Sequence, residues 1–419
     1  MSRINELIQE KCPNGVEYKK LKEIGDTFTG LSGKCKNDFT DGNSRYITYT
    51  NIYNNPAVRL DLDDKVVVAN NENQNKLEYG DILVAGSSEN LEDSGMISVV
   101  CDKPKENIYL NSFCFGFRLN KEFRDRLIPG FSKHIFRNIT FRNQILSCSF
   151  GVTRYNLNKK RFLDLTIPVP PIEVQKEIVR ILDKFGELEA ELEAELEARK
   201  SQYKFWREKI FSKEDNLMAI GYLLESKGYI RGPFGSALVK ADMVSEGMPV
   251  YEQQHAIYNH RDFRYFITLD KAKKLERFSI KPNDLIISCS GTVGKVSVIL
   301  DNDPKGIINQ ALLILRLNKK LIMPKYMKYY LESPLGYRSI TANTNKSAQV
   351  NIASRDAIEK IMIPVPPLEE QERIMNILDK FDALVNDITE GIPAEIELRR
   401  QQYDYYRNKL LSFEELPVN

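Results

Sequence analysis

Apolar residues recur at alternating steps of three and four over two long stretches of the chain, residues 172–212 and 368–410. This spacing is the heptad pattern of helices that pack side by side in a coiled coil. Each stretch also contains extra four-residue steps, a stutter that locally unwinds such a pair. The first stretch predicts a helix of about 60 Å at about 1.5 Å per residue. The predicted seam consists of Ile178, Ile181, Phe185, Leu188, Leu192, Leu196, Tyr203, Trp206 and Ile210 in the first stretch and Ile374, Ile377, Phe381, Leu384, Ile388, Ile392, Ile396, Tyr403, Tyr406 and Leu410 in the second.

The two stretches are also copies of each other. IPVPPIEVQKEIVRILDKF at 167–185 returns as IPVPPLEEQERIMNILDKF at 363–381, and RKSQYKFWREKIFS at 199–212 returns as RRQQYDYYRNKLLS at 399–412. The offset grows from 196 to 200 across LEAELEAELEA at 188–198, so the first helix is one quartet shorter. Prolines exclude a helix within IPVPP, and Gly391 with Pro393 predicts a kink or restart in the second helix. A duplication on this scale predicts two half-units of like plan.

The segments between these helices, 12–166 and 214–362, resemble each other faintly. YGDILVAGSS at 79–88 matches PNDLIISCSG at 282–291, in each case a turn, a buried strand and a loop of small residues. We predict an α+β fold with two globular domains of mixed strands and short helices, separated by two long antiparallel helices that form a coiled coil with a pseudo-twofold repeat. The predicted boundaries are 1–171 for the first domain, 172–213 for the central helix, 214–367 for the second domain, 368–413 for the distal helix and 414–419 for a tail.

Charge is distributed unevenly, although the net charge is only +2. The globular segments 1–166 and 214–362 carry 24 basic against 21 acidic and 21 against 15 residues, and residues 101–161 alone carry 13 against 4. The helical segments 167–213 and 363–419 are acidic, with 9 against 10 and 6 against 12. Basic domains are typical of nucleic-acid binding, but a solvated surface without a partner explains such an imbalance about equally well.

Candidate chemistry is sparse. The six cysteines show no paired spacing and the three histidines lie near no cysteine pair, which favours free thiols and no metal site. Neither 30–34 nor 232–236 has the spacing of a phosphate-binding loop, and no catalytic motif appears. We therefore expect a binding protein and no enzyme. The chain contains no run of about 18 apolar residues and no apolar core of a signal peptide, so we expect a cytoplasmic protein.

The ordered set of motifs resembles the specificity subunit of type I restriction-modification enzymes. The motifs are CPNGVEYKKL at 12–21, the two IPVPP blocks, a long helix that ends in Gln202 and Tyr203, GIPAEI at 391–396 and QQYDYYRNKLL at 401–411. The resemblance implies that each domain is a target recognition domain for one half of a bipartite sequence in double-stranded DNA. It also implies that the helices bind two adenine methyltransferase subunits and that an ATP-driven restriction subunit joins them. S-adenosylmethionine, ATP and Mg would sit on those partners, with no cofactor in this chain and no membrane involved.

The quartet repeat adds a geometric expectation. One Leu-Glu-Ala-Glu lengthens a helix by about 6 Å and turns it by about 40° net, against about 3.4 Å and 34° per base-pair step of DNA. One quartet more or less is therefore expected to change the unread spacer by one or two base pairs. The alternative is that the quartets are merely good helix formers with Glu for solubility.

The residues that contact DNA are harder to predict, because base and phosphate contacts use the same residue types. An ordinary surface role is at least as probable for each candidate, and aromatic residues such as Tyr46, Tyr49, Tyr251 and Phe141 are more often core. The candidates are Ser32, Lys34, Lys36, Arg45, Arg137, Arg142 and Arg154 in the first domain and Arg231, Ser236, Arg261, Arg264, Lys295, Asn345 and Lys346 in the second.

Two other functions remain open. One is the specificity subunit of a different phage-defence methylase or of a fused restriction-methylation enzyme, which co-purification from the host would identify. The other is a structural coiled-coil adaptor whose domains bind proteins, and it predicts little salt dependence where a phosphate-contacting protein shows a steep one.

Overall fold

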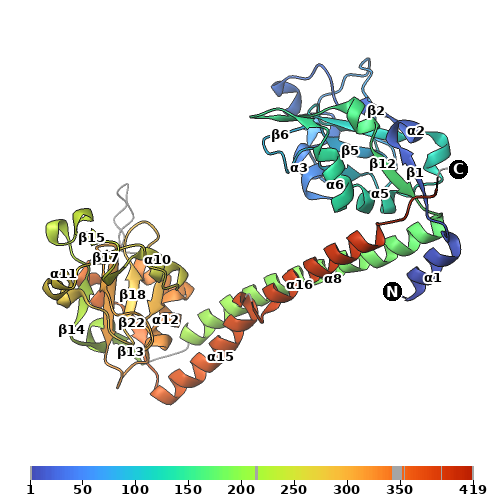
Figure 1. Ribbon diagram of the computed structural model, residues 1–419. Coiled ribbons are helices and arrows are strands. Elements are labelled where there is room, and N and C mark those ends of the chain that lie inside the picture. Colours follow the sequence, from blue (N-terminus) through green and yellow to red (C-terminus); the bar gives the residue numbers. More distant parts are fainter. Residues whose placement is uncertain (1, 213–215, 342–351, 353, 388, 418–419) are drawn as a thin grey trace. The chain divides into compact units, whose positions relative to one another are not determined.

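The computed structural model describes the 419 residues except 1, 213–215, 342–351, 353, 388 and 418–419. The chain divides into two compact units (Figure 1). Unit 1 comprises Met1–Glu191 and Ile396–Asn419, and unit 2 comprises Leu192–Glu395. The long helix α8 (Ile172–Ser212) contributes residues to both units.

The centre of unit 1 is an antiparallel sheet in the order β2 (Gly25–Thr29), β9 (Cys114–Leu119), β5 (Ile82–Ala85) and β7 (Ile97–Val99). All four residues of β5 are apolar and buried, as expected for a strand covered on both faces. Beside it, β3 (Ser44–Ile47) pairs in parallel with β8 (Ile108–Leu110). The other elements are α1 (Ser2–Lys11), β1 (Glu17–Lys20), α2 (Leu21–Ile24), η1 (Lys36–Phe39), α3 (Tyr49–Asn54), β4 (Lys65–Val66), β6 (Ser87–Ser88), α4 (Lys121–Arg124), α5 (Pro129–Ile135), α6 (Ile139–Leu146), β10 (Ser149–Phe150), β11 (Tyr155–Leu157), α7 (Lys159–Leu163) and β12 (Thr166–Val169).

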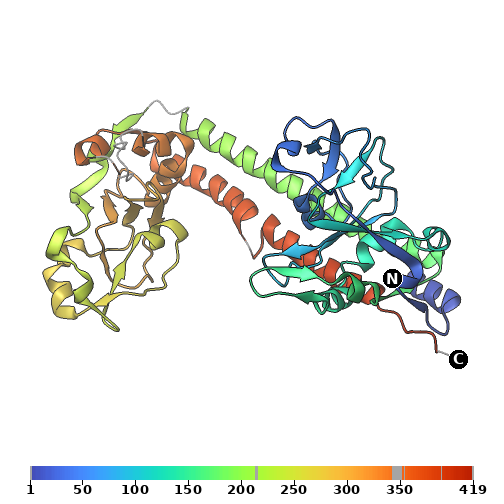
Figure 2. The same ribbon diagram turned by 90° about the horizontal axis from the view of Figure 1, so that it is seen from above.

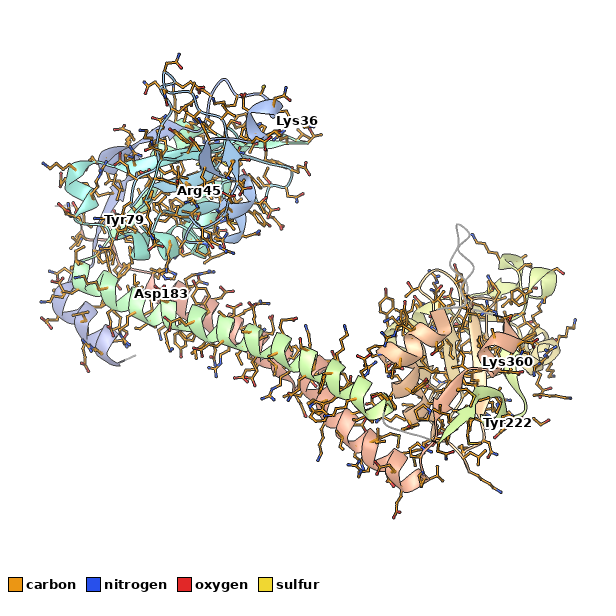
Figure 3. All side chains as sticks on the ribbon, turned by 180° about the vertical axis from the view of Figure 1, so that it is seen from behind. Lys36, Arg45, Tyr79, Asp183, Tyr222 and Lys360 are labelled. Atoms are coloured by element: carbon orange, nitrogen blue, oxygen red, sulfur yellow. The ribbon has the colours of Figure 1, made fainter. Side chains whose placement is uncertain are left out.

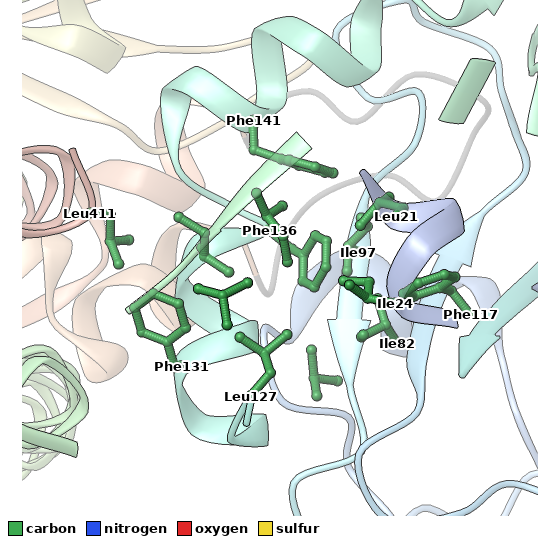
Figure 4. Packing of buried hydrophobic residues seen from close by; sticks show 14 of the residues in the cluster. Leu21, Ile24, Ile82, Ile97, Phe117, Leu127, Phe131, Phe136, Phe141 and Leu411 are labelled. Atoms are coloured by element: carbon green, nitrogen blue, oxygen red, sulfur yellow. The ribbon is translucent and has the colours of Figure 1, made fainter. Parts of the chain in front are cut away.

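The main core of unit 1 lies between this sheet and the helices that follow it (Figure 4). Ile82 and Phe117 of the sheet belong to one cluster with Phe131 of α5 and Phe141 of α6, and each is at most 2% exposed. Leu411, near the end of the chain, belongs to the same cluster. Burial of each such side chain stabilises the fold by about 1.5–3 kcal/mol, so Leu411 helps to hold the last residues of the sequence on unit 1.

Unit 2 repeats this plan. Its central sheet has the order β14 (Leu224–Arg231), β21 (Leu312–Leu317), β18 (Leu285–Ser288) and β19 (Val296–Val298), and β16 (Met248–Tyr251) pairs in parallel with β20 (Ile307–Ile308). The predicted α+β class with an internal repeat is confirmed. The other elements are β13 (Leu217–Ala219), α9 (Ile220–Leu223), η2 (Gly235–Ala237), η3 (Lys240–Asp242), β15 (Met243–Val244), α10 (Gln253–Tyr258), β17 (Phe266–Ile267), α11 (Leu269–Lys274), η4 (Glu276–Phe278), α12 (Pro324–Glu332), α13 (Pro334–Thr341), α14 (Arg355–Glu359) and β22 (Met362–Pro364).

Each unit contains the same buried ion pair on its central sheet. Arg118 Nε and Nη2 donate to Asp81 at 2.7 Å each, and Arg316 donates to Asp284 at 2.8 and 2.7 Å. Both aspartate side chains are 1% exposed. Because a bidentate pair satisfies a buried carboxylate with fixed geometry, these pairs hold the end of β9 on the turn before β5 and the end of β21 on the turn before β18.

A glutamine fastens each long helix to its domain just after the proline block. The Gln175 amide accepts from Ile128 N at 3.0 Å and donates to Pro170 O at 2.7 Å. Gln371 accepts from Met323 N at 2.8 Å and donates to Pro366 O at 2.8 Å in the same way. Both side chains are fully buried, so the repeated Gln of the sequence motif is a structural anchor.

The long helices pair in an antiparallel way. In unit 1, Phe185 of α8 stacks on Tyr406 of α16 (Ile392–Leu410) at 5.5 Å between ring centroids, and Glu189 bonds Arg400 at 2.6 Å. Residue numbers thus rise along α8 as they fall along α16, which Figure 2 draws in red. In unit 2, Tyr203 of α8 stacks on Phe381 of α15 (Leu368–Asn386) at 5.9 Å.

The distal helix is interrupted, and α15 and α16 are separate ribbons in Figure 2. The prediction placed a kink or restart near 391–393. At the break the Asp387 carboxylate accepts from Thr389 N at 2.7 Å, which ends the first helix with a local turn. A Cβ on Gly391 would lie 2.5 Å from Ala383 O, so the turn requires glycine.

The predicted seam needs correction at two positions. Trp206 and Leu384 are 37% and 39% exposed, and Val385, at 2%, takes the buried place beside Leu384. Leu182 and Leu378, which the prediction omitted, are fully buried. The physical reason is that each helix packs against a globular domain as well as against its partner helix, and Leu182 belongs to the core of unit 1. A single heptad stripe cannot describe two buried faces. Ile388 lies outside the described residues.

Candidate nucleic-acid interface

Loops with small, basic and aromatic residues gather at one end of each central sheet. In unit 1, Thr29 pairs with Phe115 and Ala85 with Cys114, so the ends of β2 and β5 meet the start of β9. In unit 2 the ends of β14 and β18 meet the start of β21 in the same way. We name these ends the loop edges. Loops on a rigid sheet are where binding residues concentrate.

A close backbone approach explains the glycine that follows β2 and β14. A Cβ on Gly30 would lie 2.1 Å from Asn111 O, and a Cβ on Gly232 would lie 1.8 Å from Asn309 O. Only glycine permits such contacts. The two loops that the sequence analysis singled out are therefore equivalent parts of the two loop edges.

Residues of the 30–36 loop differ in what they offer to a ligand. The Gln74 amide braces Ser32 by bonding its backbone N at 3.1 Å and its O at 2.9 Å. The Lys34 ammonium bonds the Glu72 carboxylate at 2.5 Å, and the Lys34 side chain is only 5% exposed. This hydrogen bond is the main reason why the pKa of Glu72 is lowered to about 2. Lys36 is exposed at the outer edge of unit 1 (Figure 3). Lys34 therefore shapes the loop, whereas Ser32, which Gln74 holds by its backbone, and Lys36 are both exposed to solvent.

Arg154 belongs to the hairpin of β10 and β11, which pairs with β6 directly after β5. Its guanidinium lies 5.4 Å from the centre of the Phe113 ring and donates to Ser87 Oγ at 3.3 Å. Next to it is a cavity of about 360 Å³, lined by polar and aromatic residues of the same edge. These lining residues are Tyr49, Tyr53, Ser87, Ser88, Glu89, Asn90, Asp93, Phe113 and Arg154.

Three other candidates of the first domain bond within the protein. Arg137 donates to the carbonyls of Ile97 and Ile52 at 2.6 Å each, and burial lowers its pKa to about 10. Arg142 donates to Gly95 O and Glu92 O at 2.9 and 2.7 Å. Arg45 pairs with Glu106 and donates to Leu60 O at 2.8 Å. These guanidinium groups tie loops to the body of unit 1, and a contact to DNA stays a prediction for them.

At the loop edge of unit 2, Arg231 lies 5.6 Å over the Phe234 ring, which is 63% exposed. Its Nη1 is buried without a hydrogen-bond partner among the described residues. Ser236 and Lys295 are exposed, and the Lys295 backbone N bonds Ser288 Oγ at 2.9 Å. Arg231, Ser236 and Lys295 thus share one edge, where β14 and β18 end and β19 begins.

The remaining candidates of the second domain lie elsewhere or cannot be placed. Arg261 pairs with Asp303 at 2.8 Å and is 16% exposed, which indicates a structural role. Arg264 is exposed and bidentate to Glu252, at 2.8 and 2.9 Å. Asn345 and Lys346 lie outside the described residues.

The exposed apolar residues of the loop edges were not among the predicted site residues. Phe113 is 59%, Phe150 56% and Val152 87% exposed. Phe113 comes directly before β9, which begins at Cys114, so the ring lies in the turn that leads into that strand. The signal was the Asn111 side chain, which accepts from Phe113 N at 2.8 Å and closes a turn of a kind that Asn commonly forms. Among the aromatics expected in the core, Tyr251 and Phe141 are buried, while Tyr46 and Tyr49 are half-buried.

Within the described ranges of the chain, no group of three or more His, Cys, Asp or Glu side chains could hold a metal ion. Across those same residues no helix is long and apolar enough to span a membrane. The six thiols, which include exposed Cys35, are all unpaired.

Comparison with known proteins gives a consistent result. The family profile described as "Type I restriction modification DNA specificity domain" matches residues 13–198 and 235–398. A type I restriction enzyme specificity subunit of Haemophilus influenzae is 31% identical over 300 residues, which cover 69% of this chain and 74% of that protein. The EcoR124I/EcoR124II specificity subunit of Escherichia coli is 32% identical over 260 residues, which cover 59% of this chain and 61% of that protein.

A solved structure has the same fold. A chain from work on "complex assembly" and "conformational transition of the type I R-M system" superposes with a TM-score of 0.67 and covers 95% of this chain and 98% of that one. Its sequence identity is 17%, so this likeness shows the fold alone.

Proposed function

The chain belongs to the family of type I restriction-modification DNA specificity subunits, and on that premise we propose that each of its loop edges reads one half of a bipartite target in double-stranded DNA. The main support for this proposal is that the loop edge occurs twice, once in each unit. Each edge presents a glycine-dependent loop and an arginine over an exposed phenylalanine, and each belongs to a globular segment with a net positive charge. Side chains of this kind supply both phosphate contacts and base contacts.

In this proposal the chain positions DNA and its partners carry out the chemistry. Adenine methyltransferase subunits would hold S-adenosylmethionine, and a separate restriction subunit would use ATP and Mg. The support is the family itself, whose members are named as specificity subunits, together with the absence of catalytic motifs from the sequence. We place no cofactor in this chain.

We further propose that the repeated helices dock two methyltransferase subunits. Equivalent exposed aromatics support this. Phe205 of α8 and Tyr405 of α16 are 58% and 60% exposed, and Lys209 and Lys409 lie 5.5 and 5.8 Å over their rings. Because the residues recur at the repeat offset of 200, the chain presents the same helix surface twice, as two copies of one partner require. The acidic balance of both helical segments disfavours phosphate contact there.

The helix α8 is proposed to set the number of unread base pairs between the two half-sites. It is uninterrupted from Ile172 to Ser212 and has residues in both units. Its Leu-Glu-Ala-Glu run shows half-buried leucines at 188, 192 and 196, so the run has a packed face as well as a polar one. A helix of fixed length is a suitable ruler because it cannot stretch without breaking hydrogen bonds.

The test is single-molecule methylation mapping in a host that lacks other adenine methylation. The full chain is produced with its modification subunit, with each protein alone as control. We expect one bipartite adenine motif that appears only when both are present. Methylation in the absence of this chain, or a motif that consists of a single uninterrupted sequence, would contradict the proposal. An adaptor that binds only proteins would leave no motif at all.

A further inference from the structure

Exposed apolar side chains are concentrated on one hairpin of unit 1. The hairpin consists of β10 and β11, and its turn carries Val152 at 87% exposure beside Phe150 at 56%. Phe113, from the turn before β9, adds a third exposed apolar side chain at 59%, next to Arg154 of the same hairpin. A cluster of this kind on a soluble surface marks a contact with a partner.

Arg154 differs from the other candidate arginines of unit 1 in how its charge is used. Arg45 pairs with a carboxylate, and Arg137 and Arg142 donate to backbone carbonyls. Among the described residues Arg154 has no carboxylate within ion-pair distance, and its hydrogen bond goes to Ser87 Oγ at 3.3 Å. The Phe113 ring, 5.4 Å away, supports the guanidinium and limits its freedom without occupying its donors.

The hairpin is held firmly on the sheet. Tyr155 pairs with Ser88 of β6, Leu157 N donates to Gly86 O at 3.0 Å, and Ser94 Oγ lies 2.8 Å from Ser149 Oγ. Its turn contains Gly151 at φ +131, where a Cβ would lie 2.0 Å from Arg154 O. Side chains on such a braced element keep their geometry better than those on a free loop.

We infer that this hairpin enters the major groove and that Arg154 reads a guanine there, which makes it a specificity-determining residue of unit 1. The inference rests on the proposed function and names the part of the loop edge that carries it. A two-stranded ribbon fits the major groove, and an arginine fork bonds O6 and N7 of guanine in a bidentate way. Val152 and Phe150 would then pack against the base edges and sugars beside that guanine, where thymine methyl groups offer apolar contact.

The experiment maps methylation for the full chain with its modification subunit, in wild type and in Arg154→Ala and Arg154→Lys. We expect Arg154→Ala to accept other base pairs at one G·C position of one half-site, with discrimination there reduced about 5- to 150-fold. The other half-site and the spacer should be unchanged. Arg154→Lys should retain guanine with weaker discrimination, because lysine keeps the charge but lacks the planar fork.

The matched control is Arg59→Ala. It removes the same charge from unit 1, but Arg59 bonds Asp61 at 2.6 Å, so its charge is already neutralised. We expect the wild-type motif for it. An unchanged motif in Arg154→Ala would overturn the inference, and so would a uniform loss of methylation that Arg154→Lys restores, since that result indicates a phosphate contact.

Two further results have a defined meaning. If Arg154→Ala yields no methylation, Arg154→Lys decides, because full wild-type discrimination in that variant refutes base reading by the fork. If the wild-type chain itself yields no bipartite motif, the proposed function fails, and that failure is distinguishable from a failure of the hairpin alone.

Discussion

Deleting Leu192–Glu195 from α8 should shorten the unread spacer of the DNA target and leave both half-sites intact. The deletion removes one Leu-Glu-Ala-Glu and leaves the repeat in phase, since Leu196 takes the place of Leu192. It also brings Glu191 to four residues before Arg199, so the ion pair that Glu195 makes with Arg199 at 3.2 Å can be replaced. The helix itself should therefore remain stable.

The magnitude follows from helix geometry. Four residues shorten α8 by about 6 Å and rotate its far end by about 40°. One base-pair step of DNA corresponds to about 3.4 Å and 34°, so the rise alone predicts a change of about two base pairs and the rotation a change of about one. We expect a spacer shorter by one or two base pairs.

The assay is methylation mapping of the deletion variant with its modification subunit. Leu192→Ala is the matched control, because it alters the same quartet at constant helix length and should leave the spacer unchanged. An unaltered spacer in the deletion variant, or altered half-sites, would refute the ruler. Equal effects of the deletion and of Leu192→Ala would point to loss of packing.

Three other predictions concern stability. Arg137→Ala should lower the free energy of unfolding by about 3 kcal/mol in a urea titration, because it removes several charge-assisted bonds to carbonyls. Asp284→Asn should lower the free energy of unfolding by about 3–5 kcal/mol, because the mostly buried Arg316 guanidinium, 17% exposed, loses its charged, bidentate partner. A loss below about 1 kcal/mol by urea titration would contradict this. Burial lowers the pKa of His134 below its usual 6.5, so as the pH falls the unfolded chain takes up a proton on this residue before the folded chain does. The protein should therefore lose stability below about pH 6.5, seen as a lower midpoint of thermal unfolding between about pH 7 and 5.5. His134→Gln should remove that part of the pH dependence.

The fold could be predicted where local chemistry determines it. The prolines of IPVPP exclude helical backbone, and α8 begins at Ile172, directly after the first block. The internal repeat indicated which segments share a plan, and the central sheets of the two units have equivalent strand orders, β2-β9-β5-β7 and β14-β21-β18-β19. The sequence did not reveal that each long helix is buried on two faces, one against its partner helix and one against a globular domain. In the sequence, the second face appears only as extra apolar positions outside the heptad stripe, such as Leu182 and Leu378.

The candidate site was less predictable, because the sequence does not distinguish an arginine that donates to backbone carbonyls from one that contacts DNA. The carbonyls that bind Arg137 come from Ile52, Tyr53 and Ile97, up to 85 residues away. Only the fold brings them together. Phe113 was missed because an aromatic residue just before a buried strand has the same sequence pattern as one inside it, and β9 begins only at Cys114.

Exchange of one domain tests the central claim most directly. The β1–β12 ladder pairs Lys20 with Thr166, so the two ends of the segment 21–165 lie next to each other. This segment can therefore be replaced by the corresponding segment of a relative. Methylation mapping of this hybrid should show one half of the motif replaced, with the other half and the spacer retained. A motif that changes in both halves, or in neither, would contradict the account of two independent reading units.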